Sequence, residues 1–247
     1  MGAKVLCLID HSLESSYALR FACMLGKERG ADVHAMHVIQ TLPFVLRWGM
    51  GYARKHWEKE QIERMGNEIK RMVESEPRCQ NVTITPIVKI GSVKGEVVDQ
   101  LKRESYDLVV TGVHYSQISQ KPYLGTLHTD LIDQSPYPLA MITSFKIPEK
   151  VLLYLDGTIA IEKTKDFIKR FFESKDINII TDFELAAEKT KDIGKSKVVK
   201  KEDVLDTLKA ELANIDTLLI ASGNVELLIY LCREVIPEML GTVILFR

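Results

Sequence analysis

The stretch from Asp107 to Ile132 carries the residue types that point most directly to chemistry. It begins with an apolar run ending at Thr111 and Gly112, continues as a polar loop, and reaches Gly125 and Thr126 before a further apolar segment. An apolar run without alternation is typical of a parallel strand covered on both faces. A glycine that opens the next helix lets backbone amides approach an anion. The spacing therefore predicts a phosphate site at the carboxyl edge of a parallel sheet.

Acidic and imidazole side chains follow other expected strands. Asp10 and His11 come after the first apolar run, and His37 lies near the end of the second. With His114 they could form a metal or acid/base site. We favour a packing role for His37 and solvated positions for His11 and His114, because the spacing lacks the H-x-x-x-H pattern of paired ligands. We therefore expect no metal site and assign no catalytic residue.

The elements that must position these residues alternate in type. Ser12 is expected to cap the first helix and Gly30 to end it. The third strand contains Pro86, which cannot donate to a ladder, so it belongs at an edge of the sheet. The expected strands are 4–9, 32–39, 82–90, 107–112 and 139–142, and the expected helices are 12–30, 58–75, 92–104 and 125–134.

The second half of the chain repeats the first in degenerate form. Lys150 to Asp156 (KVLLYLD) matches Lys4 to Asp10 (KVLCLID), and Leu208 to Ser222 mirrors Leu101 to Gly112. We therefore expect two domains, residues 1–146 with the phosphate site and residues 147–247 as a structural copy. The long loop has no counterpart in the copy, because the chain enters a helix soon after Gly223.

These residues resemble the universal stress protein family in its tandem two-domain form, over nearly the whole chain. Nucleotide-binding members carry an Asp after strand one, a His-Val at the end of strand two and a loop of the form G-x2-G-x9-G-[ST]. Here those features are Asp10, His37-Val38, and Gly112 with Gly125-Thr126 at the matching spacing. Tyr115 stands where the second glycine of the loop is expected. The resemblance implies an α/β fold of two flavodoxin-like (Rossmann-like) three-layer sandwiches, each with a parallel five-stranded sheet in the order 3-2-1-4-5.

The resemblance also implies roles for individual residues. Asp10 would bind the ribose hydroxyls, and Leu8 and Val38 would flank the adenine. Lys121 could add a cation near a triphosphate. The residues expected around the nucleotide are Leu8, Asp10, Val38, Gly112, His114, Gly125, Thr126 and Leu127.

Two functions follow, from different classes. In the first, the protein is an adenine-nucleotide (ATP)-binding stress-response regulator, with Mg²⁺ accompanying the nucleotide and at most slow ATP hydrolysis. In the alternative, it is a nucleotide-free scaffold or protein-interaction module in which Tyr115 fills the former phosphate space. The protein partner is unknown in either case. The strands 139–142 and 243–246 are expected to pair antiparallel and form an intramolecular pseudo-dimer, and a homodimer of the whole chain is left open.

Composition bears on whether the protein binds nucleic acid or a membrane surface and on the compartment in which it works. A formal charge of -1 and a pI near 6.6 give no general attraction for nucleic acid or an acidic membrane surface. The segment from Arg47 to Trp57 mixes cations with aromatic side chains, as single-strand nucleic-acid surfaces do, but near-neutrality favours a lid or dimer surface. The four cysteines form no C-x-x-C pair and no signal-type segment is visible, so we expect a reduced cytoplasmic protein with Cys79 as its exposed thiol.

Overall fold

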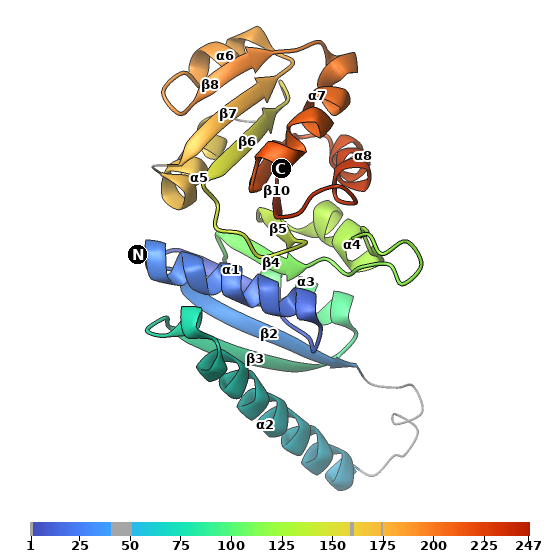
Figure 1. Ribbon diagram of the computed structural model, residues 1–247. Helices are drawn as coiled ribbons and strands as arrows, with labels where there is room; N and C mark the ends of the chain where they lie inside the picture. The colour runs from blue at the N-terminus through green and yellow to red at the C-terminus, as the bar shows by residue number, and fades with distance from the viewer. Residues whose placement is uncertain (1, 41–50, 159–160, 174) are drawn as a thin grey trace.

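The ten strands found among the described residues form one continuous sheet. The computed structural model describes residues 2–40, 51–158, 161–173 and 175–247, without the side chains of residues 52 and 53. In Figure 1 the second half lies above the first, and α2 extends from the lower end. The expected segment from Arg47 to Trp57 falls partly outside the described residues, which include neither Arg47 nor Trp48.

Helices and strands alternate through both halves. The first half contains β1 (Lys4–Leu8), α1 (Leu13–Arg29), β2 (Asp32–Gln40), α2 (Gly51–Ser75), β3 (Ile84–Gly91), α3 (Val93–Arg103), β4 (Leu108–Gly112), α4 (Thr126–Gln134) and β5 (Leu139–Ile142). The second half contains β6 (Lys150–Leu155), α5 (Ile161–Phe172), β7 (Asp176–Thr181), α6 (Glu184–Lys189), β8 (Lys195–Val198), α7 (Val204–Glu211), β9 (Thr217–Ala221), α8 (Val225–Val235) and β10 (Thr242–Phe246). Single 3-10 turns lie at η2 (Pro77–Cys79), η3 (Lys201–Asp203) and η4 (Leu212–Asn214). In these described ranges, no helix is long and apolar enough to cross a bilayer.

The strand order is β3-β2-β1-β4-β5-β10-β9-β6-β7-β8. Each half therefore has the predicted order 3-2-1-4-5, and all its internal pairs are parallel. β3 lies at one edge of the sheet, so the edge position predicted from Pro86 is confirmed. The expected division at residue 146 falls between the end of β5 and the start of β6.

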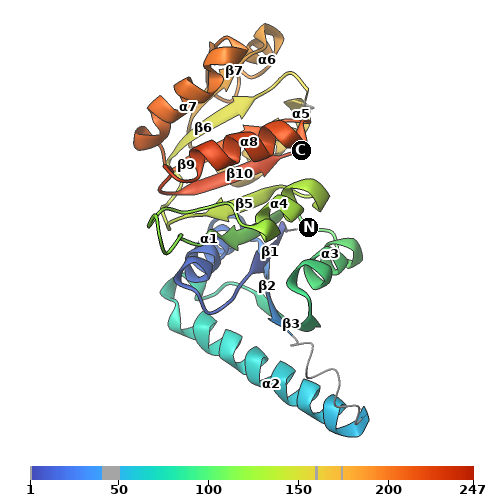
Figure 2. The ribbon, with the colours of Figure 1, turned by 90° about the vertical axis from the view of Figure 1, so that its right-hand side faces the viewer.

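The two halves meet through the antiparallel pair β5 and β10, as the sequence predicts (Figure 2). Thr143, directly after β5, is fully buried beside this seam. Its backbone amide donates to the Gly241 carbonyl at 3.0 Å, and its hydroxyl donates to the Met239 carbonyl at 2.7 Å. The seam joins the inner edge strand of each half, so neither of these edges remains open to another chain.

Hydrophobic cores cover both faces of the sheet and run through both halves. One core packs α1, α2 and α5 against the sheet, and the other packs α3, α4, α7 and α8. Successive residues of β1 alternate between them: Val5 and Cys7 belong to the first core, Leu6 and Leu8 to the second. Two covered faces explain why the strands are continuous apolar runs in sequence.

Local signals fix the position of α1 above the carboxyl ends of the strands. The Ser12 hydroxyl accepts a hydrogen bond from the Ser15 amide at 3.1 Å, which satisfies one of the free amides of the first turn. Gly30 ends the helix with a φ of 63°, a conformation that glycine adopts without steric cost. Both caps were predicted, and Ser12 marks where the loop between β1 and α1 ends.

The cysteines differ from the sequence expectation. Cys23 of α1 and Cys79 of η2 form a disulfide with their Cα atoms 4.9 Å apart, and Cys79 is only 3% exposed. The prediction of Cys79 as an exposed thiol was therefore wrong, and so was a reduced state for this pair. Cys7 and Cys232 are buried free thiols, and burial raises the pKa of both. Pairs distant in sequence cannot be assigned without the fold.

The disulfide predicts a simple thiol count. Protein unfolded without reductant should react with a thiol reagent at Cys7 and Cys232 alone, and all four cysteines should react after reduction. Cys79→Ser should lower the free energy of unfolding by about 2–4 kcal/mol, because it frees a long loop in the unfolded chain. Mass spectrometry of the labelled protein and urea unfolding measure the two effects. Labelling at all four positions before reduction would contradict the pairing.

Candidate functional site

A cavity of about 570 Å³ opens at the carboxyl ends of β1, β2 and β4. This size is in the usual range for small-ligand sites. All eight residues predicted from the sequence line it: Leu8, Asp10, Val38, Gly112, His114, Gly125, Thr126 and Leu127. The other lining residues are Ile9, Ser12, Ser15, Met36, His37, Gln40, Val93, Val97, Thr111, Tyr123 and His128.

The pairing of β1 with β4 brings the two main parts of the site together. Val5 is aligned with Leu108 and Cys7 with Val110, so both strands end at the same edge. Strand order reverses here, since β2 follows on one side and β5 on the other. The connections leave toward opposite faces of the sheet, which opens a crevice between them.

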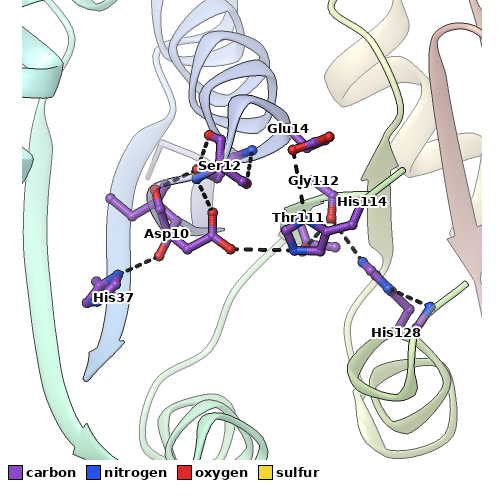
Figure 3. A network of polar contacts seen from close by, with 11 residues as sticks. Asp10, Ser12, Glu14, His37, Thr111, Gly112, His114 and His128 are labelled. Carbon is purple, nitrogen blue, oxygen red and sulfur yellow. Dashed lines mark hydrogen bonds and ion pairs between the residues drawn. The ribbon is translucent and has the colours of Figure 1, made fainter. Parts of the chain in front are cut away.

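Asp10 supplies a carboxylate on the cavity wall. Its Oδ1 accepts a hydrogen bond from the Ser12 amide at 2.8 Å, and its Oδ2 lies 3.5 Å from His114 Nε2 (Figure 3). Burial alone would raise the pKa of Asp10, but hydrogen bonds with Ser12 and Ser15 and the nearby imidazole lower that pKa below its usual value. An ionised carboxylate with an accessible oxygen is an acceptor for hydroxyl groups of a ligand.

The opposite wall is apolar and comes from four elements. The His37 imidazole contacts the Ile9 carbonyl through Nδ1 at 2.9 Å, which ties the end of β2 to the end of β1. This contact agrees with the packing role that we favoured for His37. Apolar side chains of β1, β2, α3 and α4 then form a surface suited to a flat ring: Leu8, Met36, Val38, Val93, Val97 and Leu127.

The amino terminus of α4 faces the cavity beside Asp10. Gly125 is its N-cap residue, and Thr126 and Leu127 form the first turn. The amides of a first helical turn have no partner within the helix, and the helix dipole makes this end favourable for an anion. Gly125 has a φ of -77°, so its backbone alone does not require glycine.

Gly112 has a different reason to be glycine. A Cβ atom there would lie 2.4 Å from the Glu14 carbonyl carbon and 2.8 Å from the Ser15 amide nitrogen. The start of α1 thus passes too close to β4 for any side chain. The close approach of α1 accounts for this glycine without a ligand.

Comparison with known proteins identifies the family. Residues 1–143 match the sequence model of the universal stress protein family, which is more than half of the chain. The chain belongs to the universal stress protein family. None of the curated proteins matches this sequence.

Solved structures of universal stress proteins show the same fold over both halves. One from Archaeoglobus fulgidus DSM 4304 has a TM-score of 0.70 at 15% identity, and the match covers 99% of this chain and 98% of that one. A protein from Pseudomonas aeruginosa UCBPP-PA14 assigned to the same family has a TM-score of 0.65 at 12% identity, covering 99% and 93%. At these identities the likeness shows the fold alone.

Tyr115, the departure from the universal stress protein loop pattern, lies outside the cavity. Its hydroxyl donates to the Thr143 carbonyl at 3.2 Å, and it pairs with Pro122 across a short hairpin. Burial raises the pKa of Tyr115, and Tyr17 and Glu14 nearby raise it further. In contrast to the alternative in which Tyr115 fills the phosphate space, its side chain turns toward the seam between the halves and does not line the cavity. Its φ is not positive, so the position does not demand glycine.

The remaining polar groups named from sequence have other partners or positions. Lys121 is exposed on the hairpin and does not line the cavity. His11 Nδ1 lies 3.4 Å from Glu68, and His114 Nδ1 lies 3.7 Å from Glu14. Within the described ranges, no group of three or more His, Cys, Asp or Glu side chains could hold a metal ion.

His128 is the site residue that sequence reasoning missed. It is 4% exposed, and its two ring nitrogens contact Gly125 and Gly112, the two glycines of the loop. Burial lowers the pKa of His128, the bond to the Gly112 carbonyl raises it in part, and His114 lowers it further. A histidine three residues after an N-cap was a visible signal, but nothing in the sequence connected it to Gly112.

In the second half, internal contacts occupy the position equivalent to Asp10. Asp156 is buried, and it accepts hydrogen bonds from the Thr158 amide at 2.7 Å and from the Ser222 hydroxyl. The Gly223 amide donates to the Thr158 hydroxyl at 2.8 Å. These contacts link the ends of β6 and β9 directly. They occupy the Asp156 carboxylate, whereas the equivalent carboxylate of the first half, Asp10, remains accessible.

The two loop glycines should respond differently to the same change. Gly112→Ala should lower the free energy of unfolding by about 1–3 kcal/mol, because its Cβ would push against the backbone of α1. Gly125→Ala should change it by less than about 1 kcal/mol, because its Cβ would be 3.5 Å from the nearest atom, His128 Nδ1. Urea unfolding of the two variants measures the difference. Equal losses would show that the close approach of α1 is not what restricts Gly112.

Proposed function

We propose that the first half binds an adenine nucleotide, ATP in particular, and that the protein is a nucleotide-dependent stress-response regulator. The observation that carries the proposal is the gathering of the eight predicted residues around one cavity. Membership of the universal stress protein family supports the same class of function.

The chemistry of each wall suits one part of the nucleotide. The apolar surface with Leu8 and Val38 suits the adenine ring, and the Asp10 carboxylate suits vicinal ribose hydroxyls. The amino terminus of α4, with Gly125, Thr126 and Leu127, suits a phosphate.

Charge indicates the form in which ATP would bind. Among the described lining residues there is no Lys or Arg, and Asp10 adds a negative charge. The helix terminus offsets only part of a triphosphate's charge. We therefore propose that ATP enters as its Mg²⁺ complex, and we assign no residue a role in its hydrolysis.

The loop between β4 and α4 offers a route from the cavity to the surface. Its inner ends, Gly112 and Gly125, line the cavity, and its hairpin presents Ile118, which is 97% exposed. Tyr115 connects the same hairpin to Thr143 at the seam. We propose that nucleotide occupancy changes the order of this hairpin and thereby the surface offered to a protein partner.

Asp10→Asn tests the ribose contact with little change to the fold. The Ser12 amide keeps its acceptor on Oδ1, so the new NH₂ group replaces the oxygen that faces the cavity and cannot accept from a hydroxyl. Mg-ATP affinity should fall by about tenfold to a hundredfold, since a hydrogen bond to a charged group contributes about 1.5–3 kcal/mol. Isothermal titration calorimetry measures the loss.

Two controls separate this contact from a general effect. Asp99→Asn makes the same charge change on the exposed side of α3, outside the cavity, and should retain wild-type affinity. 2′,3′-Dideoxy-ATP should bind wild type more weakly than ATP does, but Asp10→Asn should bind the two equally. No binding of Mg-ATP to wild type would refute the proposed function. Equal discrimination by wild type and Asp10→Asn would refute the role of Asp10.

Tyr115 distinguishes an open site from a blocked one. Because its side chain lies outside the cavity, Tyr115→Gly should not raise Mg-ATP affinity and should lower the melting temperature through loss of buried contacts. Tyr115→Phe should bind Mg-ATP as wild type does. A gain in affinity of about tenfold or more (about 1.4 kcal/mol) in Tyr115→Gly would support the nucleotide-free scaffold instead.

A further inference from the structure

His128 makes a pair of hydrogen bonds that fixes the position of its own proton. The Gly125 amide donates to Nδ1 at 3.3 Å, so Nδ1 carries no hydrogen. Nε2 lies 3.0 Å from the Gly112 carbonyl oxygen, which can only accept, so Nε2 carries the hydrogen. Both bonds form together only in the neutral imidazole with its proton on Nε2 (Figure 3).

The two partners of His128 are the ends of the loop that borders the cavity. Gly112 ends β4, and Gly125 caps α4. The backbone between them leaves the sheet, forms the Tyr115–Pro122 hairpin and returns. Across the described residues, His128 is the side chain whose hydrogen bonds join both glycines. Together with the bond from the Tyr123 amide to the His114 carbonyl at 3.1 Å, it holds the end of β4 near the start of α4.

We propose that His128 is a positioning residue, whose neutral imidazole holds the two ends of the loop together, and that acidification releases them. A proton on Nδ1 would face the Gly125 amide hydrogen, so two donors would meet and that bond would break. The effect on a bound nucleotide rests on the proposed function, but the effect on the loop does not.

Among the described residues, no carboxylate acts on the His128 ring to stabilise a positive charge. His114, on the loop after β4, is a titratable group that acts on this ring, and it opposes a positive charge there. Asp10 after β1 and Glu14 of α1 contact His114. On α4 itself, Asp130 is paired with Lys94 of α3 at 2.7 Å. Protonation of His128 would therefore break its hydrogen bond to the loop and would gain no ion pair in exchange.

The pH window follows from burial. In the unfolded chain His128 has a pKa near 6.5, and burial lowers this pKa in the folded protein. Above about pH 6.5 the His128 ring is neutral in both the folded and the unfolded protein. Its contribution to the free energy of unfolding is therefore fully present in that range. As the pH falls below this value the unfolded state takes up the proton first, and stability is lost.

His128→Gln is the conservative variant. A glutamine at the third helical position can accept from the N-cap amide through its oxygen, and its NH₂ group can donate to the Gly112 carbonyl. It does not titrate. His128→Leu has similar bulk but can form neither bond, and if it does not fold, the comparison of wild type with His128→Gln still decides the proposal.

The first test uses protein without nucleotide. In ¹⁵N-labelled wild type, long-range proton–nitrogen spectra should show hydrogen on Nε2 and none on Nδ1 at neutral pH. The Gly112 and Gly125 amide resonances should shift together with His128 protonation as the pH is lowered from about 8 to about 5, and should not do so in His128→Gln. Hydrogen on Nδ1 at neutral pH would overturn the proposal. So would Gly112 and Gly125 amide resonances that do not shift as His128 is protonated.

The second test uses Mg-ATP as the probe over the same pH range. Release of the loop predicts that wild type loses on the order of tenfold in affinity on acidification, whereas His128→Gln keeps its affinity. If His128 acted only as a nearby charge, acidification would instead strengthen the binding of the anion to wild type, and this result would overturn the proposal. If neither protein binds Mg-ATP, the proposed function fails and the spectra of the free protein still decide the role of His128.

Discussion

The parallel pairing of β1 with β4 is the constraint on which the site depends. It places the ends of two strands, distant in sequence, side by side at the point where strand order reverses. Asp10 and Gly112 then border one cavity, and α1 and α4 leave from the same edge. Because α1 starts directly against Gly112, the floor of the site is held by backbone packing and does not rely on mobile side chains.

The second half completes the sheet. Its last strand pairs antiparallel with β5, and the Thr143 contacts with Met239 and Gly241 link the halves next to the loop hairpin. Where the first half leaves the Asp10 carboxylate accessible, the second ties Asp156 to Ser222 and Thr158. One fold thus occurs twice in the chain, with an accessible carboxylate in the first half and an internally bonded carboxylate at the equivalent position of the second.

Much of the fold could be predicted from sequence because burial on both faces leaves unbroken apolar runs, and caps such as Ser12 and Gly30 mark helix ends. The eight cavity residues could be named because the strand ends and the loop spacing resemble those of the universal stress protein family, and strand ends in this topology meet at one edge. Side-chain contacts between residues far apart in the chain could not be predicted from the sequence. Cys79 bonds to Cys23, Tyr115 turns toward the seam, and His128 joins two glycines, and each contact depends on the distance and direction of groups far apart in the chain.

A crystal structure of the protein grown with Mg²⁺ and a non-hydrolysable ATP analogue would test the central claim most directly. The account predicts adenine against Leu8 and Val38, ribose hydroxyls donating to Asp10, and phosphate at the first turn of α4, with Tyr115 still bonded to Thr143. An analogue bound at another surface, or a cavity that stays empty at saturating ligand, would contradict the assignment of this crevice as a nucleotide site.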